Sequence, residues 1–68
     1  MQKIGHFIKE LRKEKRLTQE GLAAVFGVTQ DSISLWELDK RLPDTLYIVE
    51  MAKLFEVTSD YLLGLSDY

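Results

Sequence analysis

The stretch from Thr18 to Arg41 constrains the fold most, because it predicts two short helices joined by a tight turn. Thr18 precedes the first helix and Thr29 precedes the second, and a threonine side chain can accept a hydrogen bond from the free amides of a first helical turn. Gly27 lies between them, and glycine adopts the left-handed conformation that commonly ends a helix without a Cβ penalty. Two capping residues eleven positions apart leave almost no loop.

The apolar residues of this stretch give each helix an inward face. In the first helix, predicted over residues 19–26, the inward residues are Leu22, Ala23 and Phe26. In the second, predicted over residues 30–38, steps of about 100° per residue leave only Ile33 and Trp36 facing inward. Its outward residues are Asp31, Ser34, Leu35 and Leu38. We expect this outward face to meet a ligand.

The same helical period predicts three more helices, over residues 4–15, over residues 45–55 and in a short segment after Thr58. Asp44 precedes the second of these helices and Thr58 the third, so both are predicted caps. The residues predicted to complete the core are Ile4, Phe7, Ile8, Leu11, Ile48, Met51, Ala52, Phe55, Val57 and Leu62. The predicted fold class is therefore all-α.

Length and composition limit what such a chain can do. Its 68 residues allow one small domain, predicted to span residues 1–68, and it has no cysteine for a disulfide or a thiolate metal site. No apolar run approaches the ~20 residues that cross a bilayer, and the N-terminus lacks the apolar region of a signal peptide. We expect a soluble, cytoplasmic protein without a membrane partner.

No enzyme, cofactor or metal chemistry is indicated. His6 is the single histidine, and neither a glycine-rich phosphate loop nor a metal-ligand spacing occurs. A catalytic combination of Ser34, His6 and Asp31 would need a deep pocket, for which five short helices leave little room. We expect no small-molecule substrate.

The net charge of −2 argues against a nucleic-acid ligand, because phosphate binding usually requires a basic surface. The distribution of charge weakens that objection. Residues 1–41 carry eight Lys or Arg and six Asp or Glu, a sum of +2, whereas residues 42–68 carry one and five, a sum of −4. The first part can face a polyanion while the second faces solvent or a partner.

The central stretch resembles the phage-repressor family of helix-turn-helix domains, the lambda-repressor-like or Cro/XRE class. The matching groups, in family order and spacing, are Thr18-Gln19-Glu20, Leu22-Ala23, Gly27-Val28-Thr29-Gln30, Ser32-Ile33-Ser34 and Trp36-Glu37, followed by Lys40, Arg41 and Pro43. Residues 4–19 and 51–63 also resemble the first helix and the last two helices of that family. The resemblance implies a compact five-helix domain in which helices 2 and 3 form the helix-turn-helix, about residues 18–38, and helix 3 enters the DNA major groove.

The resemblance also implies roles for individual residues. Base contacts are expected from Gln30, Asp31, Ser34 and Leu35, and phosphate contacts from Arg12, Gln19, Ser32, Lys40 and Arg41. An Arg12–Glu37 pair, Trp36 and Gly27 are expected to be structural. Gln30 suits base readout, because a glutamine amide can donate to and accept from adenine. Asp31 can instead serve the helix dipole, or accept from cytosine.

Four residues depart from the family pattern. Leu35 and Leu38 are apolar where related sequences are polar or basic, so Leu35 can contact a thymine methyl, or both leucines can contact a protein. Gly21 lies inside a helix at a cost of roughly 1 kcal/mol relative to alanine. Asp39 replaces a glycine, although aspartate tolerates left-handed backbone better than most residues.

The resulting functional prediction is a small transcriptional regulator, a repressor, that binds a palindromic operator as a homodimer. The alternative is a protein-interaction module that presents Leu35 and Leu38 to a partner. Tyr61, Leu65 and Tyr68 remain for a dimer surface once Leu62 is placed in the core.

Overall fold

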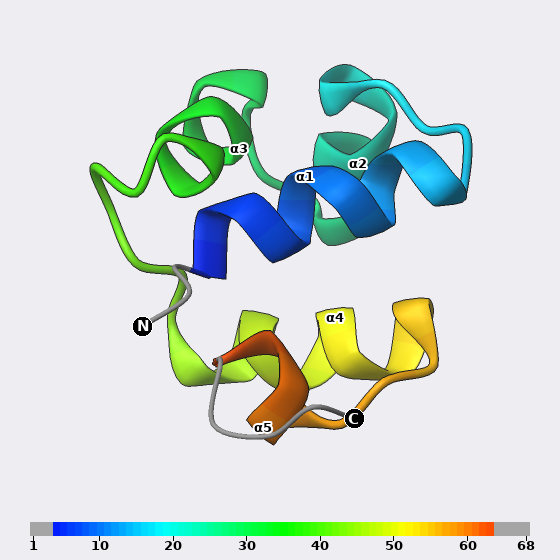
Figure 1. The fold of residues 1–68 in the computed structure, drawn as a ribbon. Coiled ribbons are helices and arrows are strands. Elements are labelled where there is room, and N and C mark those ends of the chain that lie inside the picture. The colour runs from blue at the N-terminus through cyan, green and yellow to red at the C-terminus, as the bar shows by residue number, and fades with distance from the viewer. Residues whose placement is uncertain (1–3, 64–68) are drawn as a thin grey trace.

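The computed structural model describes residues 4–63, which form five helices and no strand (Figure 1). The helices are α1 (Ile4–Glu14), α2 (Gln19–Phe26), α3 (Gln30–Glu37), α4 (Thr45–Phe55) and α5 (Ser59–Leu62). The prediction of an all-α, five-helix fold is confirmed. The predicted bounds of α2 and α4 are observed, whereas α1 and α3 each end one residue earlier than predicted.

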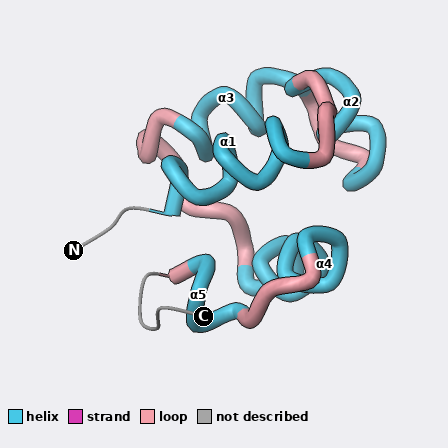
Figure 2. Tube along the Cα trace, turned by 45° about the vertical axis from the view of Figure 1, so that its right-hand side comes forward, coloured by secondary structure: helices cyan, strands magenta, loops and turns pink. Residues whose placement is uncertain are grey.

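The helices lie in two layers. In Figure 1 an upper layer contains α1, α2 and α3, and a lower layer contains α4 and α5. The 45° turn in Figure 2 shows the same separation, with the connection between α3 and α4 passing from one layer to the other. Helix α1 contacts α3 within its own layer and α5 in the other. The upper layer therefore holds the predicted helix-turn-helix, and the lower layer supports it.

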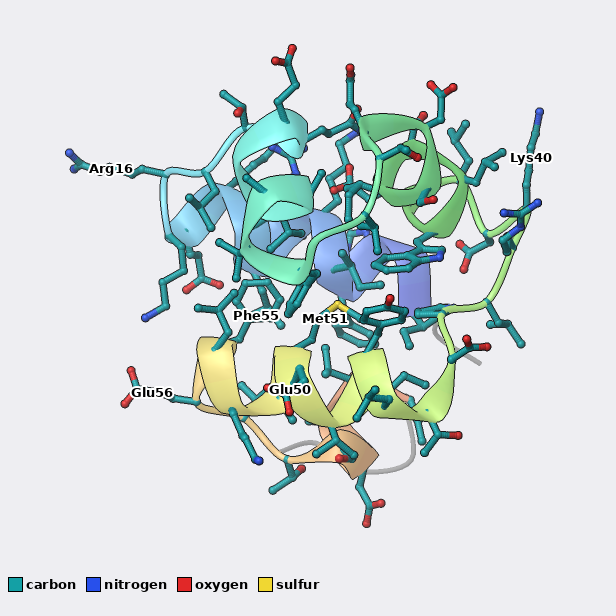
Figure 3. All side chains as sticks on the ribbon, turned by 180° about the vertical axis from the view of Figure 1, so that it is seen from behind. Arg16, Lys40, Glu50, Met51, Phe55 and Glu56 are labelled. Carbon is teal, nitrogen blue, oxygen red and sulfur yellow. The ribbon has the colours of Figure 1, made fainter. Side chains whose placement is uncertain are left out.

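The core fills the space between these layers. Figure 3 shows Met51 and Phe55 pointing from α4 toward the upper layer. The buried apolar residues are Ile4, Ile8, Leu11, Leu22, Ala23, Ile33, Trp36, Met51, Ala52, Phe55 and Leu62. All of them were predicted to face inward. Four other predicted core residues, Phe7, Phe26, Ile48 and Val57, are only partly buried and pack against the edge of this cluster.

Side-chain caps begin three of the helices. The hydroxyl oxygens of Thr18, Thr29 and Thr58 accept hydrogen bonds from the amides of Gly21, Ser32 and Tyr61 at 2.9, 3.2 and 3.0 Å. The prediction for Asp44 is wrong in part: the residue occupies the N-cap position of α4, but its side chain makes no capping hydrogen bond. Its backbone carbonyl instead accepts from the amides of Tyr47 and Ile48.

Left-handed residues end the first four helices. They are Arg16, Gly27, Asp39 and Glu56, with φ between 58° and 68°. After each, the next amide donates to a carbonyl five residues earlier, in the pairs Leu17–Arg12, Val28–Ala23, Lys40–Leu35 and Val57–Ala52. This closure is the Schellman type, in which glycine is usual. In α1 and α3 the left-handed residue lies two positions beyond the last helical residue, whereas in α2 and α4 it follows directly.

A hollow of about 550 Å³ lies where the end of α1 meets the connection between α4 and α5. Its lining residues are Leu11, Glu14, Phe55, Glu56, Val57, Thr58 and Tyr61. None of them belongs to α2 or α3. Within residues 4–63, no helix combines the length and the apolar character needed to cross a bilayer.

Candidate nucleic-acid interface

The turn between α2 and α3 contains only residues 27–29. Gly27 supplies the left-handed backbone at φ 68° and ψ 31°, and Thr29 caps the next helix. Behind the turn, Leu22 and Ile33 are fully buried and Trp36 is 3% exposed. The turn is short and both inward faces are covered, so α3 is held with one face toward solvent.

The exposed face of α3 agrees with the predicted one at its N-terminal end. Gln30 and Asp31 are exposed, whereas Ser34 and Leu35 are half-buried. Leu38 is 61% exposed and follows the last helical residue. The first turn of α3 is therefore the part of the helix most exposed to a ligand. Leu38 is a separate exposed apolar residue at the other end.

An ion pair links α1 to α3 behind this face. Arg12 Nε donates to Glu37 Oε2 at 2.6 Å and Arg12 Nη2 donates to Glu37 Oε1 at 3.2 Å, so the guanidinium binds the carboxylate with two parallel contacts. Arg12 Nη1 also donates to the Leu17 carbonyl at 2.8 Å. The side chains are 11% and 3% exposed. The predicted structural pair is confirmed; the phosphate contact of Arg12 stays a prediction.

Gln19 extends this pair toward the exposed face. Its Nε2 donates to Glu37 Oε1 at 3.1 Å, and its Oε1 accepts from Gln30 Nε2 at 3.2 Å. A carboxylate only accepts hydrogen bonds, so Glu37 dictates the orientation of the Gln19 amide, which in turn dictates that of the Gln30 amide. Sequence reasoning assigned Gln19 and Gln30 to DNA separately and missed that they are joined.

The chain of hydrogen bonds leaves Gln30 partly available. Among the hydrogen bonds of residues 4–63, its Oε1 has no protein partner, and its amide nitrogen carries a second hydrogen. One acceptor and one donor side by side match the N6 and N7 edge of adenine in the major groove. Gln30 is therefore an exposed side chain whose amide is oriented by Gln19 and keeps an acceptor and a donor for a ligand.

The other predicted base and phosphate contacts divide by environment. Asp31 is exposed in the first turn of α3, where a carboxylate favours the helix dipole. Ser32 is half-buried, and its hydroxyl lies 3.1 Å from that of Thr29, so it belongs to the helix cap. Either hydroxyl can still offer a lone pair or a proton to a phosphate.

Lys40 and Arg41 lie just beyond α3 and are exposed. Both backbone amides donate to the Leu35 carbonyl, at 2.9 and 3.3 Å, so this segment is attached to the helix end. Figure 3 shows Lys40 and Arg16 extending outward from the upper layer, and Glu50 and Glu56 lying on the lower layer. The charge asymmetry predicted from the sequence is thus an asymmetry between the two layers.

The fold and this site define a class: a first helix, a three-residue turn and a second helix with a polar exposed end are the parts of a helix-turn-helix unit. Within the described residues, no group of three or more His, Cys, Asp or Glu side chains could hold a metal ion.

Comparison with known proteins gives the family. Residues 8–62 match the helix-turn-helix family model. The uncharacterized HTH-type transcriptional regulator YobD of Bacillus subtilis is 37% identical over 60 residues, which are 88% of this chain and 54% of YobD. The HTH-type transcriptional regulator ImmR of the same organism is 34% identical over 61 residues, 90% of this chain and 48% of ImmR. The chain belongs to the helix-turn-helix family.

A solved structure supports the same fold. The P22 c2 repressor protein, crystallised in complex with a synthetic operator, superimposes with a TM-score of 0.87 and 29% sequence identity. The match covers 97% of this chain and 100% of that one. The chain is a lambda-repressor-like domain in fold, and it spans about half the length of YobD and ImmR.

Proposed function

We propose that this chain binds double-stranded DNA at specific sequences as the DNA-reading part of a transcriptional regulator, with α3 in the major groove. The observation that carries the proposal is the continuous set of hydrogen bonds from Arg12 through Glu37 and Gln19 to Gln30. It holds an exposed base-reading side chain in one orientation. The regulators YobD and ImmR and the operator complex of the P22 c2 repressor support the same function.

In this proposal the residues in and around α3 make two kinds of contact with DNA. Base edges are contacted by Gln30, Asp31, Ser34 and Leu35, and phosphates by Arg12, Gln19, Ser32, Lys40 and Arg41. Gln30 has the best chemistry for base readout, because its free acceptor and donor lie together at the exposed end of the helix. Lys40 and Arg41 supply sequence-independent attraction from the attached segment beyond it.

The finer parts of the proposal are a repressor, a homodimer and a palindromic operator. One domain offers few base contacts, and two-fold symmetry would double them, with half-sites about 34 Å apart. We propose repression because the chain resembles the P22 c2 repressor in structure. The alternative is activation, because the HTH-type transcriptional activator BcrR of Enterococcus faecalis is 41% identical over 84% of this chain and 28% of BcrR. We propose action in the cytoplasm, without a cofactor or an enzymatic activity.

A second copy needs an apolar surface. Of the residues predicted for a dimer surface, Tyr61 is half-buried, with its ring centroid 5.1 Å from that of Phe7; Leu65 and Tyr68 lie outside the described residues. Leu46 and Val49 share one face of α4 and are 67% and 38% exposed, so they are better candidates. The molar mass in solution and on DNA, measured by light scattering, tests the dimer.

The experiment that tests DNA reading compares Gln30→Ala with Lys53→Ala, an exposed change in the lower layer. Duplexes enriched from a random library by the wild type serve as ligands in a fluorescence anisotropy titration. Gln30→Ala should weaken binding to the enriched duplex by ~1–3 kcal/mol and reduce the base preference at one position, while binding to random duplex changes little. Equal losses of affinity for the enriched and the random duplex would show that Gln30 does not read a base.

One observation favours a second function. Leu38 is 61% exposed at the end of α3, which suits contact with a protein as well as with DNA. In that alternative, Leu35 and Leu38 meet a partner and the domain has no salt-sensitive affinity for random duplex at low ionic strength. Such affinity in a gel shift, retained by Leu38→Ser, would reject the alternative.

A further inference from the structure

The start of α1 lies directly on the end of α3. Gly5 is buried there, and its amide donates to Asp39 Oδ1 at 2.9 Å, a contact between residues 34 positions apart. A Cβ atom added to Gly5 would come within 2.5 Å of the Trp36 carbonyl oxygen and 2.6 Å of the Glu37 carbonyl oxygen. The backbones of the two helices are therefore in direct contact at Gly5, where any larger residue would collide with α3.

The charges at this junction are complementary. The first amides of a helix carry partial positive charge and its last carbonyls carry partial negative charge, so the start of α1 and the end of α3 attract each other. The carboxylate of Asp39 adds a full negative charge beside the α1 amides. A side chain from the end of one helix thus caps the start of another.

Asp39 makes this contact from a strained backbone. Its φ of 59° is unusual for a residue other than glycine. Arg16 and Glu56 occupy the equivalent positions after α1 and α4 with nearly the same φ, and all three residues are exposed. Glu56 reaches only Lys15, at 3.5 Å on the surface. Of these three left-handed residues, Asp39 is the one whose side chain holds a buried amide of another helix.

We propose that Gly5 and Asp39 form a latch that positions the C-terminal half of α3 and the Lys40–Arg41 segment on DNA, an inference that rests on the proposed function. At the N-terminal end of α3, Gln30 is oriented by Gln19, which is itself bound to Glu37 at the other end of the helix. Asp39 is continuous with the segment whose amides close on the Leu35 carbonyl. Release of the latch leaves the Arg12–Glu37 pair as the polar contact between α1 and the end of α3, so the last turn of α3 and the Lys40–Arg41 segment shift while Gln30 keeps its partner.

This proposal predicts a positional effect on DNA reading. Without the latch, discrimination falls at the base pairs that Ser34 and Leu35 face, and the sequence-independent affinity supplied by Lys40 and Arg41 falls with it. Discrimination at the base pair read by Gln30 persists, because its support does not pass through Asp39. A merely structural role would weaken every position equally.

The experiment compares Asp39→Gly with Asp39→Asn in the whole chain. Glycine relieves the left-handed backbone but removes the acceptor, whereas asparagine tolerates that backbone and keeps an oxygen at the same place. Arg16→Gly and Glu56→Gly are matched controls, since they relieve the same conformation where no latch exists. The readouts are amide exchange at Gly5 by NMR and affinity for the wild-type-enriched duplex and its single-base variants.

Asp39→Gly should speed Gly5 exchange by about tenfold or more, the equivalent of losing one hydrogen bond to a charged group, and lower discrimination only at the positions beyond Gln30. Asp39→Asn should restore both readouts, and the two controls should change neither. The latch is rejected if Asp39→Gly behaves like the controls, or if it weakens all base positions alike. If the wild type enriches no duplex, the proposed function fails and the positioning role fails with it.

Discussion

Both layers of the molecule contribute buried apolar side chains to the core, but the two layers differ in the polar contacts that join their helices. In the upper layer, directional hydrogen bonds join the helices: Arg12 and Gln19 to Glu37, Gln30 to Gln19, and Gly5 to Asp39. In the lower layer, buried apolar side chains such as Met51, Phe55 and Leu62 provide the contacts. The Lys15–Glu56 ion pair that bridges the layers is exposed and 3.5 Å long, so it adds little stability.

This difference separates stability from orientation. Apolar burial is the larger source of folding free energy, but it is non-directional and does not by itself set the angle of an exposed amide. Hydrogen bonds prescribe donor, acceptor and direction. We infer that the apolar core shared by both layers keeps the domain folded and that the polar contacts of the upper layer determine which way α3 presents Gln30.

The largest expected effect comes from breaking the polar contacts at their centre. Glu37→Ala leaves the largely buried guanidinium of Arg12 without its carboxylate partner and removes the acceptor of Gln19, so the free energy of unfolding should fall by ~3–5 kcal/mol. Urea denaturation followed by circular dichroism measures it.

A double variant sharpens that test. Arg12→Met with Glu37→Leu replaces the ion pair by apolar side chains, which often leaves stability unchanged or higher. We expect most of the lost stability to return while discrimination between enriched and random duplex does not. If discrimination also returns in full, the polar contacts do not orient Gln30.

The lower layer gives the contrasting variant. Met51→Ala removes a fully buried side chain and should cost ~2–5 kcal/mol of unfolding free energy through lost burial and a cavity. At a temperature where the variant stays folded, its ratio of specific to random affinity should equal that of the wild type. A changed ratio would show that the two layers are not separable in this way.

A smaller effect on DNA affinity is expected from Gln19, the residue that supports Gln30. Gln19→Ala removes the partner that orients Gln30. Because the two residues are in contact, the losses from Gln19→Ala and Gln30→Ala should be non-additive by about 0.5–3 kcal/mol in a double-mutant cycle of DNA affinity. Strict additivity would mean that Gln19 acts on phosphate alone.

The smallest expected effect is on ionic strength dependence. Lys40→Ala should lower the slope of log affinity against log salt by about 0.9 if its ammonium neutralises one phosphate, and should weaken all duplexes similarly. Lys53→Ala, in the lower layer, serves as the control and should leave the slope unchanged.

Local features of the upper layer could be predicted from the sequence. The caps Thr18 and Thr29 and the left-handed Gly27 follow from short-range chemistry, and all three are observed. The inward pair of Ile33 and Trp36 follows from helical period alone. The Arg12–Glu37 pair joins residues 25 positions apart and was predicted through the family resemblance, since no local rule specifies it.

The contacts that were missed depend on tertiary geometry. The Gln19–Gln30 hydrogen bond requires the ends of two helices to meet, and the Gly5–Asp39 contact requires the start of α1 to lie on the end of α3. Sequence patterns indicate which side of a helix is buried but not where along a neighbour it lies. Asp39 had a readable signal, an aspartate at a position that favours glycine, but its partner could not be identified from the sequence.

The central claim is that α3 reads bases through a side chain oriented from behind. Selection of bound duplexes from a random library tests it most directly, carried out in parallel with the wild type and Gln30→Ala. We predict that the wild type enriches a palindrome with half-sites about one helical turn apart and that Gln30→Ala loses the preference at one base pair per half-site. No enrichment by the wild type, or the same enriched sequence from both proteins, would contradict the account.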